Sequence, residues 1–325
     1  MIASIGAGVA QDAAGNGNTA STSTDNTVTY NAPDTTAPNT TIDTAPPALT
    51  NNNDPSFTFS SNEPGSTFEC KLGSGPWEAC DSGAKSYTDM PDGSYTFYVR
   101  ATDAATNTDP TPAEYAWTID TIAPNTTIDV GPLPLTNMND PLFFYGSNKP
   151  GSTFECKLDD GAWEPCGPTM SYTDVPDGEH TFYVRATDAA GNTDATPASY
   201  TWTIDTVAPT VTINQASGQV DPTNAGPIHF TAVFSEPVTG LDGFFDIDQS
   251  GTALPSGYPD VTEIGPMDGT TYDVVVLQPN SDGTVIVEVR DGSVSDAAGN
   301  VSTPSTSTDN EVTYDTTAPT VTINQ

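Results

Sequence analysis

The sequence predicts an all-β protein, built as a row of small β-sandwich domains in an elongated array. Three observations carry this prediction. The chain repeats itself, which is the first property to establish because it decides the fold. Apolar and polar residues alternate over short runs, as in strands with one buried face. The 29 prolines and 27 glycines supply turns between those runs, and no run of about ten residues has helical periodicity with caps.

The first thirty residues read as the end of a domain. STSTDNTVTY at 21–30 returns as STSTDNEVTY at 305–314, and DAAGN at 12–16 returns at 296–300. We therefore predict that residues 1–30 are the C-terminal fragment of a domain, and that the chain is a window cut from a longer tandem array. Such a two-stranded fragment is marginal alone, so we expect fast hydrogen exchange at its Val28 and Tyr30.

Two equivalent units follow, and we place them at 31–120 and 121–205. PGSTFECKL at 64–72 returns at 150–158. In the first unit, Phe97 and Val99 lie on one face of a strand while the flanking residues are polar or amphipathic. Asp-Gly and Pro-Asp-Gly steps separate such runs and provide turn geometry. Units of this length suit independent sandwich domains of roughly 100 residues each.

The four cysteines form two equivalent pairs, Cys70 with Cys80 and Cys156 with Cys166. A turn at Asp160–Gly161 lies midway between the second pair, so a hairpin brings its two cysteines face to face. We predict one short disulfide in each unit and an oxidising compartment. Free buried thiols and a metal site are the alternatives, but no histidine or third cysteine accompanies either pair.

The third complete unit, at 206–315, is larger and has no cysteine. Ile228, Phe230 and Ala232 share one face of a predicted strand, and further valines alternate near its C-terminus. Residues 316–325 then repeat the opening of this unit. We interpret them as the first strand of a further repeat.

Composition excludes several classes of function. The chain has 43 Asp and Glu against 7 Lys and Arg, a formal charge of −36. Nucleic acids require a basic footprint, so they are excluded as partners. Anionic membranes are disfavoured for the same reason, and no apolar run is long enough to insert into a membrane. Mutual repulsion favours a monomer whose partners are its own neighbouring repeats.

No arrangement of residues indicates an enzyme. The counterpart of His180 in the other cysteine unit is Tyr95, and a catalytic imidazole would not be exchangeable in this way. His229 lies on a strand face opposite Phe230, where we expect it to be solvated. The phosphate-binding glycine motifs are absent. We therefore predict no catalytic residues and no required cofactor.

The residues resemble a known group, the bacterial Ig-like domains strung along secreted surface proteins and giant adhesins. The resemblance rests on PGSTFECKLDDGAWEPC, PDGEHTFYVRATDAAGN and YTWTIDTVAP in one kind of unit, and on HFTAVFSEPVTGL and DGTVIVEVRDGSVSDAAGN in the other. It implies immunoglobulin-like sandwiches, a location at the bacterial cell surface, and a spacer or adhesive role, often with calcium stiffening. One departure is DAATN at 103–107, where Thr106 replaces a turn glycine and is strained if the position needs positive φ.

Calcium is the one ligand that the sequence argues for. Acidic residues cluster at the unit junctions, in pairs that bracket each final strand: Asp103 and Asp120, Asp188 and Asp205, Asp296 and Asp315. Such a strand places the second aspartate of a pair at the far end of the domain from the first. We therefore expect each aspartate to join other acidic residues on neighbouring loops or across the linker. Carboxylates suit calcium, but DAAGN is also an Asx-turn that needs no metal. Both interpretations stay open.

The tryptophans bear on a second hypothesis for function. Trp117 and Trp202 alternate with Tyr and Ile in the last strand, which indicates core packing. Trp77 and Trp163 lie near a hairpin tip, where they either pack over the disulfide or stack on a sugar. We therefore predict a structural spacer segment of an adhesin-like surface protein. The alternative is a set of modules that bind carbohydrate or a surface protein directly.

Overall fold

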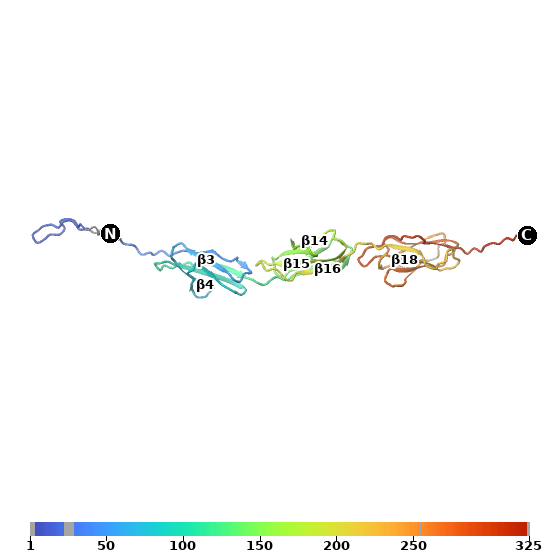
Figure 1. The fold of residues 1–325 in the computed structure, drawn as a ribbon, viewed down its shortest axis with the longest axis horizontal. Helices are drawn as coiled ribbons and strands as arrows, with labels where there is room; N and C mark the ends of the chain where they lie inside the picture. Colours follow the sequence, from blue (N-terminus) through green and yellow to red (C-terminus); the bar gives the residue numbers. More distant parts are fainter. Residues whose placement is uncertain (1–3, 23–28, 254, 256, 324–325) are drawn as a thin grey trace. The chain divides into compact units, whose positions relative to one another are not determined.

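The computed structural model describes residues 4–22, 29–253, 255 and 257–323. Every regular element in this part of the chain is a β-strand (Figure 1). None of the described segments is a helix with the length and apolar character needed to cross a membrane. The chain divides into two compact units, Met1–Ile122 and Ala123–Gln325. The domain limits that we predict from the sequence remain predictions.

The first unit contains one sandwich of two sheets, here called the first sandwich. Its strands are β1 (Thr40–Thr44), β2 (Leu49–Thr50), β3 (Ser56–Ser61), β4 (Thr67–Leu72), β5 (Glu78–Ala79), β6 (Ala84–Ser86), β7 (Gly93–Thr102) and β8 (Ala113–Ile119). One sheet has the order β1-β3-β6 and the other β2-β8-β7-β4-β5. Only the short β2–β8 pairing is parallel.

The second unit begins with a sandwich of the same topology, the second sandwich. Its strands are β9 (Thr126–Val130), β10 (Leu135–Thr136), β11 (Leu142–Ser147), β12 (Thr153–Leu158), β13 (Glu164–Cys166), β14 (Thr169–Ser171), β15 (Gly178–Thr187) and β16 (Ala198–Ile204). The sheet orders are β14-β11-β9 and β10-β16-β15-β12-β13. Equivalent sequences have therefore produced equivalent pairings.

A larger sandwich follows in the second unit, the third sandwich. Its strands are β17 (Val211–Gln215), β18 (Ile228–Phe234), β19 (Ile247–Gly251), β20 (Asp260–Glu263), β21 (Thr271–Val276), β22 (Gly283–Val289) and β23 (Glu311–Tyr314). A four-stranded sheet, β17-β18-β21-β20, faces a three-stranded sheet, β19-β22-β23. All of its strand pairings are antiparallel.

The core of each sandwich consists of the residues that alternate in the sequence. In the first sandwich the rings of Phe57 and Phe97, from opposite sheets, stack with centroids 4.3 Å apart. Trp117 and Trp202 are 2% and 1% exposed, which confirms that they pack in the cores. Complete burial of a large apolar side chain stabilises the fold by about 1.5–3 kcal/mol. The third sandwich has a more aliphatic core around Phe230.

Both predicted disulfides are present, Cys70–Cys80 and Cys156–Cys166, with Cα atoms 5.9 and 5.8 Å apart. The expectation that the two cysteines face each other across the hairpin is wrong in register. In the second sandwich Cys156 lies opposite Glu164 and Cys166 opposite Phe154. The hairpin is centred one residue earlier than the midpoint of the cysteines, so the bond runs diagonally between the strands.

The N-terminal fragment has little regular structure in its described part. Residues 4–22 form a loop in which Gly8 N donates to Asn18 O at 2.8 Å, with one isolated bridge between Gln11 and Gly17. Nearly all of these residues are exposed. The strand expected near Val28 lies outside the described residues, and Tyr30 is 79% exposed.

Candidate metal centre

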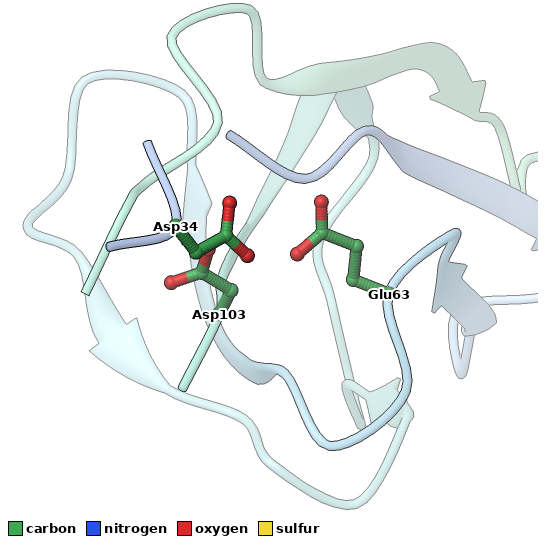
Figure 2. Close-up of side chains that lie close together, drawn as sticks. All are labelled: Asp34, Glu63 and Asp103. Atoms are coloured by element: carbon green, nitrogen blue, oxygen red, sulfur yellow. The ribbon is translucent and has the colours of Figure 1, made fainter. Parts of the chain in front are cut away.

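Three carboxylates meet at one end of the first sandwich (Figure 2). Asp34 lies in the segment that enters the sandwich, Glu63 in the turn after β3, and Asp103 directly after β7. One oxygen from each lies within 4.8 Å of the others. Figure 2 shows the carboxylates of Asp34 and Asp103 close together, with Glu63 turned toward them. We call this group the first triad.

A tight turn positions the first triad. The carboxylate of Asp103 accepts hydrogen bonds from the backbone and the side-chain amide of Asn107, both at 2.8 Å. The same amide donates to the carbonyl of Asp34 at 3.1 Å, which ties the entering segment to the turn. These bonds, led by that from the Asn107 side chain, lower the pKa of Asp103 and keep it ionised.

A second triad repeats this arrangement at the third sandwich. It comprises Asp205 in the entering segment, Glu236 after β18, and Asp296 in a DAAGN turn, again within 4.8 Å. The Asn300 side-chain amide donates to Asp296 Oδ2 and to the carbonyl of Asp205, both at 2.8 Å. Burial opposes ionisation of Asp296, but the bonds from Asn300 outweigh it and lower the pKa of this carboxyl.

The second sandwich differs from the other two at one position. Lys149 occupies the place of Glu63 in the repeated sequence, and its ammonium lies 2.7 Å from Asp188 Oδ2. Burial acts against the charge of Asp188, but the ion pair with Lys149 prevails and lowers its pKa to about 2. Here the chain itself supplies a cation beside the turn aspartate.

The triads lack such a cation among the described residues. Burial, followed by the charges of Asp34 and Asp103, raises the pKa of Glu63. Burial, followed by the charges of Asp296 and Asp205, raises the pKa of Glu236. Like charges held this close repel each other, and a divalent cation between them relieves the repulsion. The donors are all oxygens, which suits the hard ions calcium and magnesium.

The structure separates the predicted aspartates into three groups. Asp103, Asp205 and Asp296 belong to triads, and Asp188 belongs to the ion pair with Lys149. By contrast, the carboxylate of Asp315 accepts a bond from Thr317 N at 2.8 Å, and that of Asp120 accepts one from Ile122 N at 3.2 Å. Asp120 and Asp315 belong to neither triad.

Sequence reasoning missed three members of the triads: Asp34, Glu63 and Glu236. A signal was available, because Glu-Pro follows a strand at 63–64 and again at 236–237, whereas Lys-Pro stands at the equivalent place in the second sandwich. Each glutamate could be identified from this motif, but the two aspartates that complete its triad are distant from it in the sequence.

The hairpin tryptophans lie under cations of their own chain. Lys71 Nζ is 4.9 Å and Arg100 Cζ 4.3 Å from the ring centroid of Trp77. Trp163 has equivalent neighbours at 5.6 and 4.4 Å. Lys71 alternates with the buried Cys70 along β4, so the ring packs on the outer sheet face, away from the disulfide. Cation–π contacts therefore occupy these rings.

Among the described residues, neither histidine ring has a hydrogen bond to a serine, threonine or cysteine side chain. His180 is 9% exposed and lies between Asp159 and the carbonyl of Pro176, each at 2.9 Å. Tyr95 donates to the equivalent carbonyl of Pro91 at 2.7 Å, which explains why the two residues exchange. His229 is half-buried and pairs with Asp273 at 3.0 Å, so it is less solvated than expected.

Comparison with known proteins agrees with the fold. Residues 27–121 match the family model for a bacterial Ig-like domain, and residues 168–226 match that for a bacterial Ig-like domain of group 3. The resemblance to bacterial Ig-like domains is confirmed for these segments, as is the prediction of tandem all-β Ig-like domains. No curated protein matches the chain in sequence.

Among solved structures, the chain is similar to parts of adhesion proteins. A bacterial ice-binding adhesin, described in relation to host cell surface retention, is 15% identical over 86% of this chain and 98% of that one, with a TM-score of 0.40. A Ca²⁺-stabilised adhesin of an Antarctic bacterium is 20% identical over 86% and 74%, with a TM-score of 0.34. A tetra-tandem repeat from the extending region of a large adhesion protein is 18% identical over 86% and 74%, with a TM-score of 0.31.

Proposed function

We propose that this chain is a structural spacer segment of a bacterial cell-surface adhesin-like protein, in which calcium stiffens the joints between domains. Its sandwiches link or present other domains, and its partners are the neighbouring repeats. One observation carries the proposal: in each triad, one carboxylate comes from the entering segment and two come from the sandwich that it enters. A cation shared among them fixes the joint.

The remaining features are consistent with this role. Two disulfides suit an oxidising, extracellular location. A charge of −36 keeps domains and copies of the chain apart. Three carboxylates, with carbonyls nearby, make a weak calcium site, roughly 10⁻⁴–10⁻³ M as in extracellular modules. Because burial and the neighbouring aspartates raise the pKa values of Glu63 and Glu236, protons compete with calcium at a higher pH than they would at ordinary glutamates.

Solution X-ray scattering of the full chain at fixed ionic strength tests the proposal. Millimolar calcium should lengthen and narrow the distribution of end-to-end distances. The double variant Glu63→Lys, Glu236→Lys carries its own cation at both joints, as the second sandwich does at Lys149. It should therefore not respond to calcium. A wild-type distribution unchanged by calcium, or an equal response in the double variant, would leave the DAAGN motif as a turn only.

A further inference from the structure

Three aromatic side chains gather on the surface of the third sandwich. Phe244, Phe245 and Tyr258 are 48%, 65% and 57% exposed. The ring of Phe244 lies 4.2 Å from that of Tyr258 and 4.5 Å from that of Phe245, both edge to face. Single exposed apolar residues are ordinary, but a contiguous aromatic cluster marks an interaction site. We call it the aromatic cluster.

The fold holds the two phenylalanines in place. Asp242 Oδ1 accepts hydrogen bonds from the backbone amides of Phe244 and Phe245, each at 2.8 Å. Asp246 Oδ2 accepts a bond from Asp242 N at 2.7 Å and closes the loop. The rings are therefore presented outward by an ordered loop, and binding a ligand there does not require the loop to be ordered first.

A pocket of about 240 Å³ adjoins the aromatic cluster, and Tyr258 belongs to both. Its polar wall consists of Asp248, Gln249 and Arg290. The Arg290 guanidinium is 2.7 Å from Asp248 Oδ1 and also donates to the carbonyl of Phe245. These contacts fix a donor and an acceptor beside the aromatic rings.

One acceptor in this wall is unpaired. Gln249 Nε2 donates to the carbonyl of Gly257 at 3.1 Å, which orients the amide. Gln249 Oε1 is buried and has no hydrogen-bond partner within the part of the chain that the structure describes. An unpaired buried acceptor is costly, so a small movement of the side chain that lets a ligand hydroxyl or a water donate to it is favoured.

These features select the chemistry of the ligand. A sugar ring has an apolar C–H face that packs on aromatic rings and a rim of hydroxyls that both donate and accept. The pocket is small for a drug-sized ligand but large enough for one such ring. Asp242, Asp246 and Asp248 outnumber Arg290, so an anionic ligand is repelled. We propose that the aromatic cluster and its pocket bind a neutral pyranose unit of a surface glycan.

This site differs from the one that the sequence suggested. Trp77 and Trp163 are each covered by a lysine and an arginine of their own chain. Among the described residues, no lysine or arginine stacks on a ring of the aromatic cluster. The third sandwich therefore offers a cluster of uncovered rings, whereas the hairpin tryptophans of the first two are covered.

Saturation-transfer difference NMR on the full chain tests this proposal. The probes are the neutral methyl glycosides of glucose, galactose, mannose and N-acetylglucosamine. At least one should receive saturation mainly on the C–H protons of a single ring face. Phe244→Ala and Tyr258→Ala should each weaken its affinity about tenfold, the contribution of one aromatic contact. Gln249→Leu, which removes the unpaired acceptor, should also weaken it.

A matched control is Phe144→Ala. Phe144 is 44% exposed but lies on β11 of the second sandwich, so its loss should leave the signal unchanged. All four replaced side chains are at least partly exposed, and unchanged melting curves would show that the variants fold. The proposal is overturned if no probe gives a signal, or if the signal survives Phe244→Ala and Tyr258→Ala together. Binding of an apolar peptide through these rings, without any sugar signal, would also overturn it and assign the cluster to a protein partner.

Discussion

Thr106 holds a backbone conformation that glycine holds elsewhere in the same motif. Its φ is 72°, against 86° at Gly15, 94° at Gly191 and 96° at Gly299. A β-branched residue is strained in this region because its Cβ approaches the following carbonyl. The sequence alone located the strain, since the repeats show which residue the turn prefers.

Thr106→Gly should therefore stabilise the first sandwich by about 0.5–1 kcal/mol, the strain relieved less the greater entropy of glycine in the unfolded chain. Chemical denaturation followed with a probe in the first sandwich would measure it. Gly191→Thr is the reciprocal control and should destabilise the second sandwich by a similar amount. A neutral or destabilising Thr106→Gly would show that neighbouring contacts offset the strain.

His180 gives the second sandwich a group that titrates near neutral pH, whereas its counterpart in the first sandwich is Tyr95. Burial lowers its pKa, but the bonds to Asp159 and to the carbonyl of Pro176 outweigh burial, so the pKa lies above 6.5 in the folded state. A raised pKa means that the folded state binds the proton more tightly. The stabilisation is complete below about pH 6.5 and is lost as pH rises through the folded pKa.

We expect the melting midpoint of the second sandwich to fall relative to that of His180→Tyr between about pH 6 and pH 8. Tyrosine makes the same contact in the first sandwich without titrating in this range. The difference between the two proteins, measured at each pH, cancels the titration of all other groups. A difference that does not change with pH would show that His180 contributes only through packing.

At the scale of strands and loops, the sequence predicts the strands well and the junctions poorly. Alternation located the buried faces at Phe97 and Phe230 because strand periodicity is a local property. The predicted register of the cysteine hairpin was wrong because the hairpin is centred one residue earlier than expected, and a small shift of the turn changes every pairing. The first triad joins Asp34, Glu63 and Asp103, whose proximity depends on how three loops close. The aromatic cluster was not predicted for the same reason, because the proximity of Tyr258 to Phe244 depends on how separate loops fold.

We expect the residue in the turn after β3, β11 and β18 to determine whether the neighbouring turn aspartate needs a cation. Lys149→Glu should give the second sandwich the carboxylate that Glu63 and Glu236 supply in the others. Without calcium, we expect destabilisation of about 1–2 kcal/mol, because Asp188 loses the ion pair that lowers its pKa. Calcium at a few millimolar should restore the melting midpoint.

Lys149→Gln is the matched control for that substitution. It removes the same ion pair but adds no carboxylate, so it should be destabilised without being rescued by calcium. If calcium rescues both variants equally, or rescues neither, the residue at this position does not determine whether a cation binds beside Asp188.

On the scale of the whole molecule, the charge of −36 and the triads act on the joints in different ways. Diffuse repulsion between domains straightens an array from a distance and weakens as salt screens it. A cation in a triad acts locally, by holding the entering segment against the sandwich. Positive ions take part in both effects. To tell screening from binding in a triad, one needs a measurement in which the two change the end-to-end distance in opposite directions.

Sodium chloride and calcium provide that measurement. Raising the salt from about 10 mM to about 150 mM shortens the screening length from roughly 30 Å to 8 Å. Without calcium, the mean end-to-end distance from scattering should then decrease, because repulsion no longer straightens the joints. Calcium added at 150 mM salt should increase the distance again, whereas magnesium at equal concentration should do so less, because it resists dehydration and demands a tighter geometry. If calcium instead decreases the end-to-end distance, as sodium chloride does, and magnesium is equally effective, calcium only screens charge and the triads do not bind it.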